Sequence, residues 1–238
     1  MSAQQWHANG NPKYSVWMVD GKFHRTDGPA VYQWYTNGTP RSELWFTEGN
    51  YHRTDGPAVR QWYNGTLHSE SWYTEGNYHR TDGPAERQWG NGGSLQVESW
   101  YTEGNYHRTD GPAMRKWGNG GSLQVESWYT EGKLHRTDGP AERNWGNGGS
   151  LQSEWWFTEG KLHRTDGPAM RKWDNVGSLQ TEWWYIEGKC ITEVKFRRMI
   201  ARKSLQDKIL RSSRLLTLGE EVHSLPHDTL SVIGGFLE

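Results

Sequence analysis

Apolar and polar residues alternate in short runs along most of the chain, a pattern typical of half-buried β-strands. Residues 95–102 form one such run, and a second begins at Asn105, after the dipeptide Glu103-Gly104. Glycine in this place supplies the positive φ that a tight hairpin turn requires. The pattern therefore predicts two antiparallel strands joined by a two-residue turn.

This two-strand unit recurs along the chain. The heptapeptide His-Arg-Thr-Asp-Gly-Pro-Ala begins at His24, His52, His79, His107, His135 and His163. Fourteen of the 16 tryptophans form two series with the same spacing, namely Trp17, Trp45, Trp72, Trp100, Trp128, Trp156 and Trp184, and Trp6, Trp34, Trp62, Trp89, Trp117, Trp145 and Trp173. A fixed period of this length indicates a repeat architecture in which each unit packs on its neighbours. Residues 1–188 are thus predicted to form seven repeats of about 28 residues.

A second turn signal completes each unit. Most copies carry Asn-Gly, as at Asn119-Gly120, between the second strand and the first strand of the next run. With two turns in every unit, we predict an all-β repeat array, an antiparallel β-hairpin meander or solenoid of about 14 strands. The abundance of aromatic residues (13%) argues against disorder, because disordered segments are poor in them.

The Glu-Gly turn also fixes a register. Its length pairs Tyr101 with Tyr106 and places Ser99 opposite Arg108. Proline cannot donate to a ladder, so a kink is expected at Gly111-Pro112. We interpret the recurring Asp-Gly-Pro segments as structural turns in which the aspartate bonds the following backbone; they include Asp55, Gly56, Pro57, Asp82, Gly83, Pro84, Asp110, Gly111 and Pro112.

Residues 189–238 depart from the repeat and are predicted to form a small α-helical C-terminal cap. Ser204 with Asp207 suggests a helix start, and Gly219 a helix end. A further helix is expected near Ser224, with Pro226 in its first turn. A cap of this kind would cover the last open strand and block edge-to-edge association.

The repeated motif of an aromatic residue, Glu-Gly and then His-Arg-Thr-Asp-Gly-Pro-Ala resembles MORN-type repeat proteins, in particular the variant arrays that large DNA viruses encode. The resemblance covers about 185 residues and departs from the common MORN unit, which is shorter and richer in glycine. It implies single-layer or coiled β-hairpin arrays. It also implies roles as scaffolds, in self-association and in phospholipid contact.

The repeated motif and the single cysteine do not favour an enzyme. Histidine and aspartate stand three residues apart in the heptapeptide, which is compatible with acid–base or metal chemistry. However, six equivalent copies are more typical of building units than of one active site, and no nucleophile recurs beside a base. Cys190 is the only cysteine, so neither a disulfide nor a four-cysteine zinc site is possible within one chain. We expect no cofactor, no metal and no small-molecule substrate.

The sequence favours a non-enzymatic scaffold that mediates protein–protein interaction or self-assembly. Under the viral resemblance, a virion or minor capsid component belongs to this class, with capsid proteins as partners. The predicted contact surface combines aromatic and histidine residues of the central repeats: Trp72, Trp100, Trp128, Trp156, His79, His107 and His135. The alternative interpretation of the tryptophans is structural, with the rings covering one another along the array.

Two further functions remain as alternatives. The first is a module that binds anionic lipid or glycan, through the tryptophans or through a basic run that includes Arg197, Arg198, Arg202 and Lys203. The array itself is not expected to bind nucleic acid, because a glutamate precedes six of the seven tryptophans of one series by two residues. The second alternative is an adaptor to a host ubiquitin ligase, since residues 225–233 resemble the opening helix of an F-box.

The start of the sequence lacks the apolar core of a signal peptide. No apolar run approaches the roughly 20 residues that span a bilayer. We therefore expect a soluble intracellular protein, not secreted and without a transmembrane segment, located in the host cytoplasm or the virion if it is viral.

Overall fold

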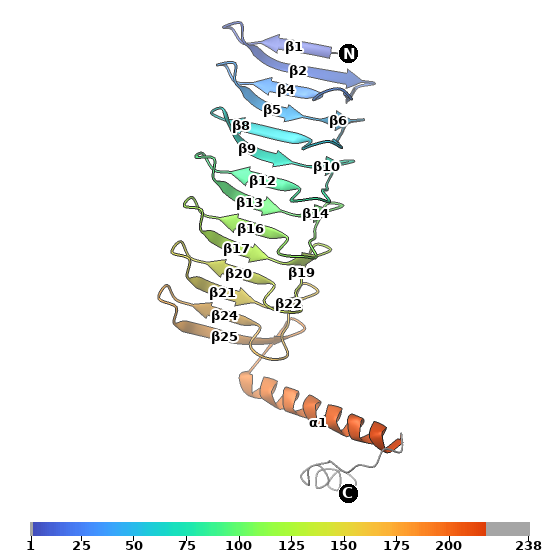
Figure 1. Cartoon of the computed structure of the whole chain (residues 1–238), viewed down its shortest axis with the longest axis vertical. Coiled ribbons are helices and arrows are strands. Elements are labelled where there is room, and N and C mark those ends of the chain that lie inside the picture. Colours follow the sequence, from blue (N-terminus) through green and yellow to red (C-terminus); the bar gives the residue numbers. More distant parts are fainter. Residues whose placement is uncertain (1, 218–238) are drawn as a thin grey trace. The chain divides into compact units, whose positions relative to one another are not determined.

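A computed structural model describes residues 2–217 and confirms an all-β hairpin array followed by one helix. The chain divides into two compact units, Met1–Cys190 and Ile191–Glu238. In the first unit a 16-stranded antiparallel sheet, here called the main sheet, runs in sequence order from the N-terminus (Figure 1).

Seven hairpins supply the long strands of the main sheet. They are β1 (Ser2–Trp6) with β2 (Pro12–Val19), β4 (Val31–Trp34) with β5 (Pro40–Leu44), β8 (Val59–Tyr63) with β9 (Thr66–Ser71), β12 (Glu86–Trp89) with β13 (Leu95–Ser99), β16 (Met114–Trp117) with β17 (Leu123–Ser127), β20 (Glu142–Trp145) with β21 (Leu151–Trp155), and β24 (Met170–Trp173) with β25 (Leu179–Ile186). These 14 strands match the number that the sequence predicts.

The Glu-Gly turns belong to a second set of short hairpins, here called the arms. Five arms form separate two-stranded sheets, and β3 and β26 add short strands to the main sheet at its two ends. The bounds of these strands are β3 (Lys22–Phe23), β6 (Phe46–Thr47), β7 (Asn50–Tyr51), β10 (Tyr73–Thr74), β11 (Asn77–Tyr78), β14 (Tyr101–Thr102), β15 (Asn105–Tyr106), β18 (Tyr129–Thr130), β19 (Lys133–Leu134), β22 (Phe157–Thr158), β23 (Lys161–Leu162) and β26 (Lys189–Ile191). Figure 1 shows the arms along one side of the main sheet and the Asn-Gly connections along the opposite side.

The arm turns have the expected backbone conformation. Glu103 has a φ of 50° and Gly104 a φ of 80°, and the same pair of positive values recurs at the other arms. Two successive positive φ angles define the type I′ turn, whose twist matches that of the flanking strands. The predicted pairing of Tyr101 with Tyr106 is confirmed.

The predicted pairing of Ser99 with Arg108 is wrong. Ser99 pairs with Glu86 of the preceding strand and with Met114 of the following one. The chain leaves the main sheet after Ser99, makes the arm and returns through Thr-Asp-Gly-Pro, so Arg108 never enters that ladder. The expected kink therefore takes the form of a loop between the arm and the next long strand.

Small residues and aromatic rings fill the thin interior. The alanine that ends each heptapeptide is fully buried in all six copies, and its carbonyl accepts the amide of a tryptophan, as from Trp100 to Ala113 at 2.7 Å. The arms carry a continuous column of ring contacts with centroid distances of 4.3–5.3 Å, formed by Phe23, Phe46, Tyr51, Tyr73, Tyr78, Tyr101, Tyr106 and Tyr129. Each repeat is thus stabilised by contacts with its two neighbours.

The second unit contains α1 (Glu193–Thr217), a single 25-residue helix. The hydroxyl of Thr192 accepts the amide of Lys195 at 3.3 Å, which makes Thr192 the N-cap. The predicted start at Ser204 is wrong, because Ser204 lies in the middle of this helix. The predicted stop at Gly219 and the helix expected near Ser224 fall outside the described residues.

Candidate functional site

Each heptapeptide arginine lies on a tryptophan of its own repeat. The guanidinium carbon of Arg108 lies 4.0 Å from the ring centroid of Trp100. Its Nε donates to Asp110 at 2.7 Å, and its Nη1 donates to the carbonyl of Pro112 at 3.5 Å. Equivalent arginine–tryptophan contacts at 3.9–4.0 Å join Arg25 to Trp17, Arg53 to Trp45, Arg80 to Trp72, Arg136 to Trp128 and Arg164 to Trp156.

This stacking explains the glycine of the Asp-Gly-Pro segment. A Cβ atom built on Gly111 would lie 3.1 Å from the guanidinium carbon of Arg108, closer than most real Cβ contacts. The backbone there is not in a left-handed conformation, so the requirement is space and not φ. Sequence reasoning identified the turn correctly but gave it no role in holding the arginine.

The aspartate of each loop is an exposed acceptor whose charge is held by the arginine. The hydrogen bond and charge of Arg108 lower the pKa of the Asp110 carboxyl, and the same cause lowers it in the other five loops. The Asp110 side chain is 76% exposed, so solvent screens this ion pair strongly. The pair orients the guanidinium on the ring more than it adds to stability.

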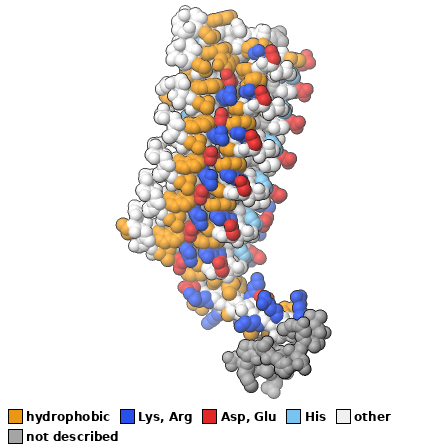
Figure 2. Space-filling model, viewed as in Figure 1, with side chains coloured by type: hydrophobic (Ala, Val, Ile, Leu, Met, Phe, Trp, Pro, Cys, Tyr) orange, Lys and Arg blue, Asp and Glu red, His pale blue; other side chains and the backbone are white. Residues whose placement is uncertain are grey.

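A second row of charges crosses the strands on the same face. Arg115 donates to Glu126 at 3.2 Å, and Arg87 lies between Glu70 at 3.3 Å and Glu98 at 4.0 Å. Equivalent pairs join Arg60 to Glu43, Arg143 to Glu154, and Arg171 to Glu182. Figure 2 shows basic and acidic side chains alternating along the face of the array. Sequence analysis missed this row, although an arginine and a glutamate recur 11 residues apart in most repeats.

The heptapeptide histidines connect neighbouring repeats. Nδ1 of His107 accepts the amide of Glu131 in the next arm at 3.3 Å, and His24, His52, His79, His135 and His163 make the same bond. Because Nδ1 accepts, the ring proton of the neutral imidazole lies on Nε2. A backbone bond runs beside it, from the amide of Gly132 to the carbonyl of Tyr106 at 2.9 Å. These histidines therefore help to set the spacing of the loops.

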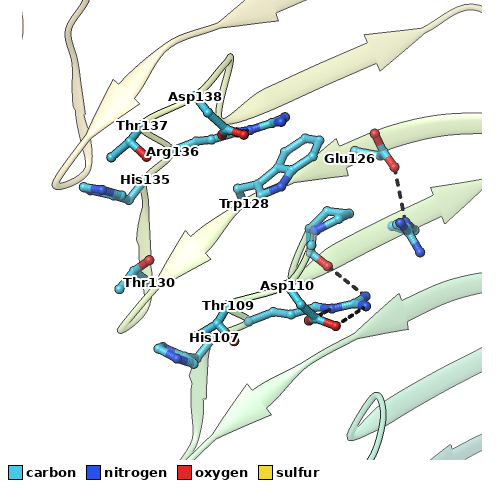
Figure 3. A pocket seen from close by; sticks show the side chains of 14 residues that line it. His107, Thr109, Asp110, Glu126, Trp128, Thr130, His135, Arg136, Thr137 and Asp138 are labelled. Atoms are coloured by element: carbon cyan, nitrogen blue, oxygen red, sulfur yellow. Dashed lines mark hydrogen bonds and ion pairs between the residues drawn. The ribbon is translucent and has the colours of Figure 1, made fainter.

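An open groove lies between two successive loops. It has a volume of about 610 Å³ and extends from the loop of His107 to the loop of His135, with Trp128 between them (Figure 3). Thr109 and Asp110 line one side, and Thr137 and Asp138 line the other. Its lining is mainly hydroxyl, carboxylate, imidazole and guanidinium groups, which suit hydrogen bonding more than the enclosure of an apolar ligand.

Of the predicted contact residues, Trp128, His107 and His135 line this groove, but they are not its most exposed groups. Trp72, Trp100, Trp128 and Trp156 are half-buried, each with a guanidinium over the ring. His79, His107 and His135 are also half-buried and bonded to the next repeat. The loop threonines and aspartates are exposed, and sequence reasoning assigned them no contact role. The binding role of the tryptophans and histidines remains a prediction.

The basic run lies on the surface of α1. Arg197, Arg198, Arg202 and Lys203 are all exposed, and Arg197 pairs with Glu193 one turn earlier. No helix within residues 2–217 combines the length and apolarity needed to cross a bilayer. The F-box-like segment, residues 225–233, lies outside the described residues.

Among residues 2–217, no three histidine, cysteine, aspartate or glutamate side chains gather closely enough to hold a metal ion. No family model and no curated protein matches the chain.

Proposed function

We propose that this protein is a non-enzymatic repeat scaffold whose loop-bearing face binds a protein partner at several equivalent positions. The observation that carries the proposal is the six-fold recurrence of one exposed loop on one continuous sheet. Strands in a sheet lie about 4.8 Å apart, so two strands per repeat separate equivalent loops by about 9.6 Å. A partner with repeated features would engage several loops at once, and its affinity would rise through multivalency.

The chemistry of the grooves favours a polypeptide over a sugar. Sugar rings stack on open aromatic faces, whereas the arginines cover the tryptophans here. The exposed threonines and aspartates instead offer acceptors and donors to peptide groups and to basic side chains. Together with the MORN-type resemblance, this supports a structural role. If the protein is viral, this role is that of a virion or capsid component, and the protein is located in the host cytoplasm or in the particle.

The test is affinity purification and mass spectrometry with matched baits. The blocking bait carries Thr81→Arg, Thr109→Arg and Thr137→Arg, three exposed loop positions. The control bait carries Gly92→Arg, Gly120→Arg and Gly148→Arg on the opposite side, where an added Cβ meets no atom within 4 Å. A partner of the loop face should fall by about tenfold with the blocking bait only, since central interface positions dominate affinity. Equal recovery with both baits would exclude the loop face.

One observation favours a second candidate, binding of α1 to an anionic membrane surface. The helix contains eight Lys/Arg residues and only two acidic residues, Glu193 and Asp207. A basic residue near an anionic leaflet contributes about 1 kcal/mol. Vesicles containing phosphatidylserine should therefore sediment the protein at low salt, and replacement of Arg197, Arg198, Arg202 and Lys203 by alanine should abolish this. Equal sedimentation by neutral vesicles would contradict this candidate.

A further inference from the structure

All six junctions between neighbouring repeats share one register of three cross-strand pairs. At the junction of β13 and β16, Val97 pairs with Lys116, Glu98 with Arg115, and Ser99 with Met114. The other five junctions keep this pattern, and five of the six have a central Glu–Arg pair. The register is therefore a property of the repeat, independent of the residues at any one junction.

The main sheet begins at β1 and ends at the three-residue β26, which follows β25 through the Glu187-Gly188 turn; β1 and the part of β25 that precedes Trp184 carry the two halves of one more junction. At the first strand, Ala3, Gln4 and Gln5 occupy the places of Met114, Arg115 and Lys116, as the alignment of Trp6 with Trp117 shows. All five residues of β1 are exposed, and within residues 2–217 β1 pairs only with β2. In β25, Thr181, Glu182 and Trp183 occupy the places of Val97, Glu98 and Ser99.

We propose that β1 of one copy pairs with β25 of a second copy in this same register, so that the repeats continue head to tail from one chain to the next. The pairs would be Thr181 with Gln5, Glu182 with Gln4, and Trp183 with Ala3 of the second copy. This goes beyond the proposed function of the loop-bearing face, and it gives the self-assembly expected from the sequence a specific partner and surface.

The side chains at the two edges fit each other. Trp183, 45% exposed, is a tryptophan like Trp155 one repeat earlier, which pairs with Met170, and it would face Ala3, the smallest residue at the opposing position. Glu182 has an arginine on one side only, Arg171, and its side chain is 29% exposed, against 15% for Glu126 between two arginines. Gln4 would complete that environment with an amide donor.

The backbone of the edges is also suited to pairing. β1 contains neither proline nor a charged residue, the features by which edge strands are commonly protected from association.

Sedimentation velocity of the full chain over a range of concentrations tests the proposal. Wild type should form a concentration-dependent series of oligomers. Gln4→Arg restores the arginine found at five internal junctions and should tighten association by about tenfold, whereas Gln4→Glu should weaken it by a similar factor. A monomer at every concentration would overturn the proposal. So would weaker association of Q4R, since a symmetric pairing of two β1 strands would bring two like charges together.

A cysteine cross-link tests the register itself. At an internal junction the ring of Tyr106 contacts that of Tyr129 in the next repeat, with centroids 4.9 Å apart. Cys190 is the equivalent of Tyr106 in the last repeat, and Met18 is the equivalent of Tyr129 in the first. Under mild oxidation Met18→Cys should give a ladder of covalent trimers and longer species. Wild type, with one cysteine, can form only covalent dimers. Absence of the ladder while association persists would overturn the head-to-tail register.

The result is separable from the function of the loop face. The loop variant with Thr81→Arg, Thr109→Arg and Thr137→Arg leaves both edge strands unchanged, so it should lose its partner and still self-associate. Gln4→Glu should do the reverse. Loss of both properties in either variant would show that one surface serves both, contrary to the inference.

Discussion

The repeat array and helix α1 use charged residues in opposite ways. In the array each heptapeptide arginine has a tryptophan beneath it and an aspartate beside it, and most strand arginines face a glutamate across the sheet. In α1 consecutive basic residues such as Arg197 and Arg198 point in different directions, because each residue advances the helix by about 100°. Their side chains are exposed.

This difference shows how a chain with few aliphatic residues can form an ordered array. Repetition places a complementary neighbour at a fixed position beside every charged and aromatic group, so many weak contacts add along the sheet. In α1 the charged residues lie on all sides of the helix, and the ion pair of Arg197 with Glu193 joins residues one turn apart in the same helix and not residues of neighbouring repeats. The array should therefore respond to single substitutions more strongly than α1 does.

The largest contrast is expected for alanine. Ala113→Leu inserts extra carbons at a fully buried position and should destabilise the array by about 1–3 kcal/mol through overpacking. The same change at exposed Ala201 of α1 should alter the free energy of unfolding by less than about 0.5 kcal/mol. Urea denaturation followed by tryptophan fluorescence and by circular dichroism measures both. Equal effects at the two positions would remove the distinction between the regions.

A smaller contrast is expected for arginine. Arg108→Ala uncovers Trp100 and should cost about 1 kcal/mol, the usual range for a cation over an aromatic ring. Arg108→Lys should recover only part of this, because an ammonium lacks the flat guanidinium and its forked donors. Arg202→Ala on α1 is the matched control, with no measurable change expected. Full recovery by lysine would show that charge alone matters at this site.

The tyrosine column should make the array sensitive to alkali. Burial raises the pKa of the Tyr73 and Tyr101 phenols, mainly by desolvation. An unfolded tyrosine ionises near pH 10.0, while the folded phenol stays neutral to higher pH. The stability contributed by these residues is therefore present below pH 10 and is lost as pH rises above it. The melting temperature of the double variant Tyr73→Phe with Tyr101→Phe should decrease less between pH 9 and 11 than that of wild type. An equal decrease in both proteins would contradict the burial effect.

The smallest expected effect is at acid pH. Arginine lowers the pKa of the loop aspartates below the value of 3.8 for an unperturbed carboxyl. A carboxyl whose pKa is lower in the folded than in the unfolded state stabilises the folded protein at pH values above its unfolded pKa. This stabilisation is lost as the pH falls through the folded pKa. The melting temperature should thus decrease as the pH is lowered below about 4. Replacing Asp82, Asp110 and Asp138 by asparagine should make this decrease slightly smaller. An unchanged pH profile would mean that solvent screens the pairs completely.

Much of the array could be predicted from local sequence. Glu103-Gly104 and Asn119-Gly120 mark turns because few residues other than glycine tolerate positive φ, and the short turn sets the pairing of Tyr101 with Tyr106. The start of α1 was not predictable in the same way. Thr192 caps it, and Ser204 has an equally good capping side chain but lies inside the helix.

The candidate site could be located but not described. The heptapeptide marks the position of the loops, and its glycine and aspartate indicate a turn. That Arg108 lies on Trp100, and that Thr109 and Asp110 form the exposed lining of a groove with Thr137 and Asp138 of the next loop, depends on two successive repeats lying side by side.

The sequence alone determined the period, the two turns in each unit and hence the number of long strands, because these depend on residues within a few positions of one another. Only the tertiary structure decided that each unit divides between the main sheet and an arm, and which side chains meet across the boundary between repeats. Alternation along a strand gives the face of each residue but not the identity of the neighbouring strand. That neighbour is selected by packing and by hydrogen bonds between residues about one repeat apart, such as the bond from the Glu131 amide to His107.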